Sequence, residues 1–313
     1  MADFNLKNKA SANKIVRGGI MSRRTKGDII FDTINTIFMV IFTIIILYPL
    51  LNMVAVSFND GLDALKGGIY LWPRIFTTKN YSTVLSMKNM GNAVRTSVLR
   101  TVIGTLSATF VTALLAYILS RKDFLFKKSL SLLYVVTMYV NGGLIPVFLV
   151  YKSLGLTNNF LVYVLPGMVP AFSMLVLRTY MNGLPDSLAE SAMIDGAGHF
   201  TIFFRIILPL CMPVIATVAL FTAVGQWNSW FDVMIYNRMS DNLTTLQYEL
   251  MKLLSSVTNQ KSNSEVMKNA TGTVTPTSVR AAATVVTSLP IIILYPFLQR
   301  YFVAGLTIDG VKE

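Results

Sequence analysis

The chain has 313 residues, of which 53% are hydrophobic and only 13% are charged, and its mean hydropathy is +0.57. An ordinary soluble domain carries about a quarter charged residues, so this composition excludes such a domain and predicts a membrane protein. The single cysteine, Cys211, excludes an internal disulfide, and the single histidine, His199, leaves little material for a metal site or a Ser/His/Asp triad. We interpret Cys211 as a small buried apolar residue and His199 as a loop residue.

The formal net charge is +12, with an isoelectric point near 9.8. Such a charge is one sign of a nucleic-acid partner. The basic residues cluster beside apolar segments, however, and membrane topology explains that arrangement by itself. We therefore expect a lipid bilayer and no nucleic acid as partner.

Six apolar runs are long enough to cross a bilayer, for which a helix needs about 20 residues. In chain order they cover residues 33–57, 101–119, 129–151, 158–177, 206–227 and 281–299. The first run is too long for the apolar part of a signal peptide, and no A-x-A-like cleavage site follows it, so we interpret it as a retained helix. The chain is therefore predicted to be all-α, a polytopic membrane bundle of about six transmembrane helices.

Prolines recur inside these runs, and each removes a backbone donor and bends its helix. They are Pro49, Pro146, Pro166, Pro170, Pro213, Pro290 and Pro296. Such bends fit a bundle that changes shape, and they fit a static bundle nearly as well.

Lysines and arginines beside the runs predict the orientation, because they stay on the cytoplasmic side. They cluster at 7–26 and again at 121–128. We therefore predict a basic cytoplasmic arm over 1–30, a cytoplasmic C-terminus, and larger outside segments at 58–95 and 231–279. Lipid headgroup binding is the alternative for the arm.

The loop after the fourth run predicts a short surface helix that begins near residue 186. Ser187 and Glu190 have the spacing of a capping box, and Gly196 and Gly198 should end the helix within about three turns. An apolar face of Leu188, Ala192 and Met193 would pack it against the bundle. From periodicity alone, a docking element and an ordinary connecting loop both remain open.

This loop resembles the EAA loop of ABC-importer permeases, whose pattern is EAA, three residues, G, nine residues, I-x-LP. The residues at those spacings are Glu190, Ala192, Gly196, Ile206, Leu208 and Pro209. Ser191 departs from the usual alanine, which exchanges one small residue for another. Asp195-Gly196-Ala197 looks like the carbohydrate branch, which is similar to the second membrane subunit of maltose transporters.

Two other stretches support that branch, and with them the resemblance covers about 31–313. One is Asn80-Tyr81, which follows Phe76-Thr77, and the other is the ending 302–312.

The resemblance implies a type I ABC importer permease fold over 31–313, with a cytoplasmic coupling loop at about 184–209, in the plasma membrane of a prokaryote. It implies as partners a sister permease, two ATP-binding cassette ATPase subunits and an external sugar-binding protein. The coupling residues would be Ser187, Glu190, Ala192, Asp195, Gly196 and Ala197. Among them, Glu190 would make a polar contact with the ATPase, and Gly196 would form the tight turn.

The sequence lacks the G-x-x-x-x-G-K-[ST] phosphate loop, so the chain is not expected to be an enzyme or to hydrolyse ATP itself. It also lacks H-E-x-x-H and Cys/His clusters, and we expect no cofactor or metal on this chain, with ATP and magnesium held by the partner ATPases. Few ionisable residues lie at predicted mid-membrane depth, which weighs against an ion-coupled secondary transporter, the alternative function.

A candidate substrate path lies near the outer end of the fifth run, at Gln226, Trp227, Asn228 and Trp230. Aromatic rings can lie on the C–H faces of sugars, and amides can bond their hydroxyls. With the polar stretch near 255–275, this segment looks closest to permeases for complex oligosaccharides. The alternative is that the tryptophans only anchor the helix at the membrane interface.

Overall fold

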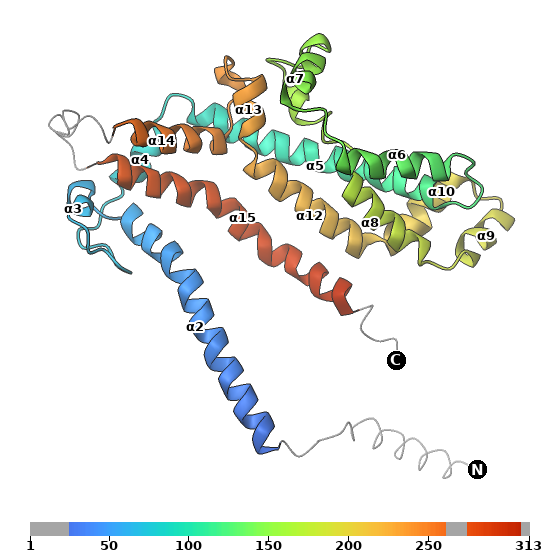
Figure 1. Cartoon of the computed structure of the whole chain (residues 1–313), viewed down its shortest axis with the longest axis horizontal. Coiled ribbons are helices and arrows are strands. Elements are labelled where there is room, and N and C mark those ends of the chain that lie inside the picture. The colour runs from blue at the N-terminus through green and yellow to red at the C-terminus, as the bar shows by residue number, and fades with distance from the viewer. Residues whose placement is uncertain (1–24, 261–273, 308–313) are drawn as a thin grey trace. The chain divides into compact units, whose positions relative to one another are not determined.

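The computed structural model describes residues 25–260 and 274–307 (Figure 1). Residues 1–24 of the predicted arm over 1–30 and the ending after 307 lie outside the described residues. The described residues form helices and no named strand, with one isolated bridge between Asn59 and Phe76. The chain divides into two compact units, Met1–Asn52 and Met53–Glu313, and the all-α prediction is confirmed.

Helix α2 (Lys26–Ser57) begins in the first unit and covers the first predicted run. Its start is a capping box, in which the Thr25 N–H donates to Asp28 Oδ2 (2.8 Å) and the Asp28 N–H donates to Thr25 Oγ1 (3.2 Å). Apolar side chains lie on every side of the helix, which is the pattern of a helix that spans lipid.

The second unit is built around helix α5 (Met90–Ser120), which packs against α8 (Ala171–Asn182) and α12 (Met212–Asn228). Helix α15 (Pro276–Thr307) packs on the other side of α12 (Figure 1). The shorter elements are α3 (Gly61–Leu65), α4 (Lys79–Leu85), α6 (Lys127–Tyr139), α7 (Leu144–Ser153), η1 (Phe160–Tyr163), α9 (Ser187–Ile194), α10 (His199–Ile202), η2 (Phe203–Ile207), α11 (Leu208–Leu210), α13 (Phe231–Tyr236), η3 (Asp241–Leu243) and α14 (Leu246–Gln260).

Three described helical stretches are long and apolar enough to cross a membrane: α2, α5 and Pro276–Ile293 of α15. A fourth span results if His199–Leu210 and Met212–Asn228 are counted together, although the two halves meet at 81°. The predicted count of about six unbroken spans is therefore not confirmed.

Three predicted spans are wrong as single helices, and one of them is the run 206–227, which the 81° bend between Leu210 and Met212 divides. The run 129–151 is divided at residues 140–143, where Gly143 adopts φ +85°, into α6 and α7. The run 158–177 is divided into the short 3₁₀ helix η1 and α8, with Pro166 and Pro170 between them. Proline supplies no backbone donor, and glycine adopts φ values that a helix does not use, so both interrupt an apolar run that looks continuous by hydropathy.

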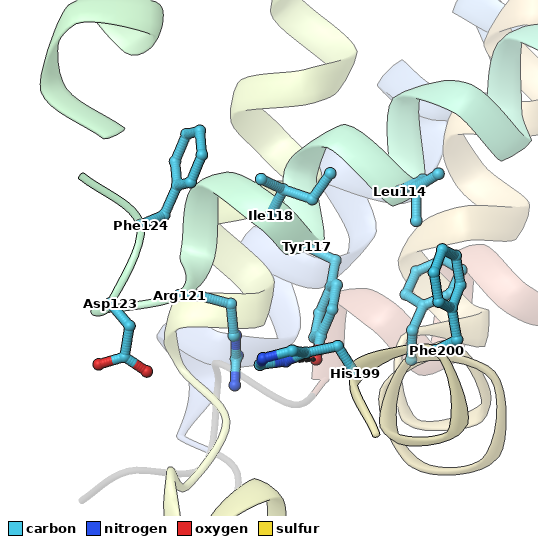
Figure 2. Close-up of a pocket in the computed structure, with 9 residues that line it drawn as sticks. Leu114, Tyr117, Ile118, Arg121, Asp123, Phe124, His199 and Phe200 are labelled. Atoms are coloured by element: carbon cyan, nitrogen blue, oxygen red, sulfur yellow. Dashed lines mark hydrogen bonds between the residues drawn. The ribbon is translucent and has the colours of Figure 1, made fainter. Parts of the chain in front are cut away.

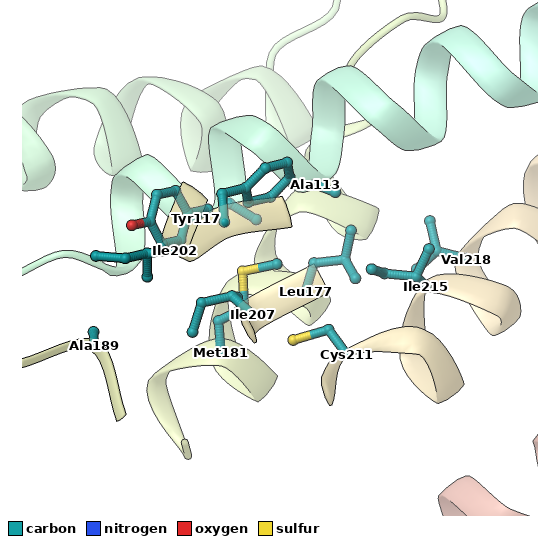
Figure 3. Packing of buried hydrophobic residues seen from close by; sticks show 12 residues of the cluster. Ala113, Tyr117, Leu177, Met181, Ala189, Ile202, Ile207, Cys211, Ile215 and Val218 are labelled. Atoms are coloured by element: carbon teal, nitrogen blue, oxygen red, sulfur yellow. The ribbon is translucent and has the colours of Figure 1, made fainter. Parts of the chain in front are cut away.

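Buried apolar residues gather in three clusters, and the third contains Leu156, Val162, Tyr163, Val233 and Tyr248. The first, called here the coupling core, contains Ala113, Ala116, Tyr117, Leu177, Met181, Ala189, Ile202, Phe203, Ile207, Cys211, Ile215 and Val218 (Figure 3). The second, called here the tryptophan cluster, contains Val84, Met90, Ala93, Trp227, Leu246, Leu250, Val279, Ala282 and Ala283. Alanines in both clusters let neighbouring helices approach closely, as is usual between membrane helices. The prediction that Cys211 is buried is confirmed.

Candidate functional site

The predicted short surface helix exists as α9, and its inner face differs from the prediction. Ala189 is 4% exposed and belongs to the coupling core, and Ala192 packs partly buried against it. Leu188 and Met193, which were expected to face inward, are each 39% exposed. Small residues thus form the contact between α9 and the coupling core, and the longer side chains of Leu188 and Met193 are not part of it.

The start of α9 has no capping box, so that prediction is wrong. Ser187 is the first residue of the helix, and the N-cap position belongs to Asp186, whose side chain caps no backbone donor. The Asp186 carboxylate instead forms an ion pair with Lys122, with Nζ and Oδ2 2.5 Å apart. The hydrogen bond from Lys122 lowers the pKa of Asp186. Both side chains are exposed, so this pair orients the loop more than it stabilises the fold.

The end of α9 is a Schellman motif, and it explains the spacing of the family pattern. Gly196 adopts φ +83°, its N–H donates to Met193 O (3.0 Å), and the Ala197 N–H donates to Ala192 O (2.9 Å). These two bonds satisfy carbonyls that the helix end would otherwise leave unpaired. Ala192 and Ala197 are both partly buried against the coupling core. The predicted turn at Gly196 is confirmed, and it ends the helix without Gly198.

The outer face of α9 carries the polar coupling candidates. Ser187, Glu190 and Asp195 are exposed, and none of them belongs to the coupling core. The helix therefore presents both these polar groups and the exposed apolar side chains of Leu188, Met193 and Ile194 outward, while alanines hold it to the bundle.

A pocket of about 370 Å³ lies beside this loop, between the end of α5 and α10. Figure 2 shows the Tyr117 and His199 side chains approaching each other next to Arg121. The Tyr117 hydroxyl lies 3.5 Å from His199 Nδ1, and the Arg121 guanidinium lies 4.9 Å from the centre of the Tyr117 ring. His199, which was expected in a loop, is the first residue of α10. These contacts tie the segment after α9 to the end of α5.

The second half of the family pattern lies in a widened helical turn. Residues Phe203–Ile207 form a π-helix, in which the Leu208 N–H reaches Phe203 O five residues back. Pro209 has no N–H to donate to the carbonyl four residues earlier, which favours this widening. The chain then bends by 81° between Leu210 and Met212. Ile206, Leu208 and Pro209 thus shape the bend that leads into α12.

A polar cleft of about 500 Å³ forms a second candidate site. Its lining includes Arg100, Tyr151, Tyr163, Phe221, Gln226, Ser229, Asp232 and Tyr236. Arg100 is 3% exposed and pairs with Asp232, which is 23% exposed, with Nη2 and Oδ2 2.6 Å apart. Gln226 accepts two hydrogen bonds from Arg100 and donates from Nε2 to Tyr163 O (3.0 Å).

Of the four residues predicted for the substrate path, only Gln226 lines this cleft. Trp227 is 8% exposed inside the tryptophan cluster, and its indole N–H donates to Thr287 O of α15 (2.9 Å). Asn228 is exposed and accepts from Gln247 Nε2 (3.0 Å), and Trp230 packs partly buried against a third apolar cluster.

Sequence reasoning missed Arg100 and Asp232. The available signal was a charged residue beside an apolar run, since Arg100 immediately precedes the run at 101–119.

In the described part of the chain, no group of three or more His, Cys, Asp or Glu side chains could hold a metal ion.

A helix bundle with several apolar spans, in which one short exposed helix is held by a small-residue contact, defines a polytopic membrane protein. The family model of the binding-protein-dependent transport system inner membrane component matches residues 108–308. The chain belongs to this family, so it is a multi-pass membrane permease subunit and not an enzyme.

Individual relatives agree with this assignment. The polygalacturonan/rhamnogalacturonan transport system permease protein YtcP of Bacillus subtilis (strain 168) is 34% identical over 286 residues, which cover 90% of this chain and 98% of that protein. The arabinooligosaccharides transport system permease protein AraQ of Halalkalibacterium halodurans is 30% identical over 300 residues, which cover 93% of this chain and 100% of that protein. A chain of a bacterial ABC transporter involved in the import of the acidic polysaccharide alginate superposes with a TM-score of 0.81 at 28% sequence identity. The superposition covers 89% of this chain and 98% of that chain. These likenesses identify the fold as that of an ABC importer permease.

Proposed function

We propose that this chain is one of two permease subunits of an ABC importer for oligosaccharides, driven by ATP hydrolysis on separate ATPase subunits. The observation that carries the proposal is α9, a helix closed by the Gly196 turn, held by Ala189 and Ala192, and exposing Glu190. A helix so placed can enter a cleft of an ATPase and transmit its movement. Family membership supports this function over the ion-coupled secondary transporter.

The partners in this proposal are a sister permease, two ATPase subunits that hold ATP and magnesium, and an external solute-binding protein. Closure of the ATPase pair would displace α9, and the contacts of His199 and Arg121 around Tyr117 would pass that displacement to α5. The bundle would then change between inward-facing and outward-facing states, a two-state change biased by ATP and substrate.

The polar cleft is the part of the substrate path that this chain supplies in our proposal. It places hydrogen-bonding side chains and aromatic rings on one concave surface of an otherwise apolar bundle. Relatives named for polygalacturonan or arabinooligosaccharide transport support an oligosaccharide, and their names leave the charge of the substrate open.

The proposal predicts that the complex reconstituted with sister permease, ATPase subunits and binding protein takes up one or more oligosaccharides from a panel. We expect ATP hydrolysis to rise severalfold when the loaded binding protein is added. Uptake that persists without ATP and follows a proton or sodium gradient would instead indicate the secondary transporter.

The orientation is a further proposal, with both termini in the cytoplasm and residues 231–279 outside. In a Cys211→Ala background, a cysteine at Asn8 or Ser22 should resist a membrane-impermeant thiol reagent added to intact cells. Met239 is 91% exposed in the described structure, so Met239→Cys should react and serves as the control. External labelling at Asn8 or Ser22, with Met239→Cys protected, would reverse the orientation.

A further inference from the structure

We infer that the polar cleft selects neutral oligosaccharides and disfavours chains that carry free uronic acid carboxylates. The inference rests on the proposed function, because it concerns the substrate of that same cleft. Of the residues that line the cleft, only Arg100 and Asp232 carry a formal charge. The charge preference of the cleft therefore depends on which of these two groups a substrate can reach.

Arg100 has no donor left for a substrate. Its Nε–H donates to Gln226 Oε1 (3.2 Å), and Nη2 donates to Gln226 Oε1 (3.1 Å) and Asp232 Oδ2 (2.6 Å). Nη1 donates to Asp232 Oδ1 (3.2 Å) and Ser229 O (3.3 Å). A guanidinium has five N–H groups, so these five bonds use them all. One face of the guanidinium is also covered, because its carbon lies 4.4 Å from the centre of the Tyr163 ring.

Asp232 is the member of the pair that the cleft exposes, at 23% against 3% for Arg100. Its Oδ1 atom accepts from Arg100, from Ser229 Oγ (3.0 Å) and from the Val233 N–H (2.9 Å). Its Oδ2 atom accepts only from Arg100 among the bonds described, so one lone pair remains. A sugar hydroxyl can donate to that lone pair, whereas a carboxylate has no proton to donate to it. Because the charge of Asp232 is already balanced by Arg100, and all the N–H groups of Arg100 are in use, the cleft also offers a substrate carboxylate no free cation.

The remaining lining suits uncharged sugar. The Gln226 amide uses one of its two N–H groups on Tyr163 O, and the other can serve a sugar hydroxyl. The Tyr236 ring stacks on Phe148 and lies 5.2 Å from Tyr151, and Phe221 is 59% exposed at the cleft. Such rings offer flat apolar surfaces to the C–H faces of sugars without any requirement for charge.

The test compares two substrates that differ only in charge: an oligogalacturonide as its free acid and the same chain as its methyl ester. Neutral arabino- and galacto-oligosaccharides of equal length complete the panel, and uptake is measured with the reconstituted complex at saturating binding protein. We expect neutral chains to be taken up, with the free acid at least about tenfold slower than the best neutral substrate. Uptake of the free acid as fast as its ester, or faster than every neutral chain, would overturn the inference.

An Asp232→Asn variant locates the selection in the cleft. It removes the exposed carboxylate but keeps the side-chain shape, so the ratio of acid to neutral uptake should rise about tenfold. Asp241→Asn is the matched control, because Asp241 is exposed, lies outside the cleft lining and should leave the ratio unchanged. An unchanged ratio in Asp232→Asn would contradict the inference. The comparison in the unaltered protein stands even if that variant does not assemble.

The proposed function and this inference fail in different ways. If no saccharide of either class is taken up and the loaded binding protein does not stimulate ATP hydrolysis, the proposed function is wrong. If saccharides are taken up and the free acid is preferred, only the inferred selectivity is wrong.

Discussion

A Gly196→Val variant is expected to reach the membrane and assemble, and to lose at least nine-tenths of its ATP-driven transport. Gly196 holds φ +83° at the end of α9, where a β-branched residue is strained. A left-handed conformation costs an ordinary residue about 1–2 kcal/mol, which is enough to open one turn but not to unfold the bundle. The Schellman bonds would break, and the exposed face around Glu190 would lose its fixed angle.

Gly198→Val provides the matched control two residues away. Gly198 has φ −75° and ψ 163°, an extended conformation that valine adopts readily, and an added Cβ would meet no atom within 4 Å there. Uptake and ATP hydrolysis stimulated by the binding protein should therefore stay near the unaltered level. Similar activity in the two variants would mean that the turn at Gly196 does not set the coupling geometry.

Trp227→Ala is expected to lower the amount of folded protein strongly. The indole fills the tryptophan cluster and bonds the Thr287 carbonyl of α15. Removing a buried tryptophan typically costs about 3–5 kcal/mol, which is a large part of the stability of a domain. Detergent-solubilised protein should show a lower melting temperature by fluorescence-detected size exclusion.

Trp72→Ala is the control for this loss, because Trp72 is 83% exposed and its removal should change the free energy of unfolding by less than about 0.5 kcal/mol. The predicted sugar contact would require the opposite result for Trp227. Full yield with an uptake defect that depends on the oligosaccharide would place Trp227 on the path.

Local signals in the sequence predicted the helical class, the first span and the turn at Gly196. These features depend on neighbouring residues: apolar length for α2, and a glycine that accepts positive φ for α9. The predicted capping box of Ser187 failed because Ser187 already lies inside the helix, where the Glu190 N–H donates to Asp186 O (3.1 Å). The Asp186 carboxylate pairs with Lys122, which lies 64 positions earlier and cannot be paired with it by periodicity.

The polar cleft escaped sequence reasoning for the same reason. Arg100 and Asp232 are 132 positions apart, and only the packing of α5 against α12 brings them together. Hydropathy also could not separate a continuous span from one divided at Gly143 or at Pro166, because the average over the run hides a single backbone break.

The five hydrogen bonds of Arg100 also restrict how the helices around it can move relative to one another. They fasten α5 to Gln226 of α12 and to Asp232 of α13, with the guanidinium stacked on η1. Separating these elements would expose an unpaired buried cation, which is costly. They should therefore travel as one rigid body. The flexing needed for a transport cycle is left to the 81° bend at Cys211, where Pro213, two residues on, supplies no N–H to the helical bonding.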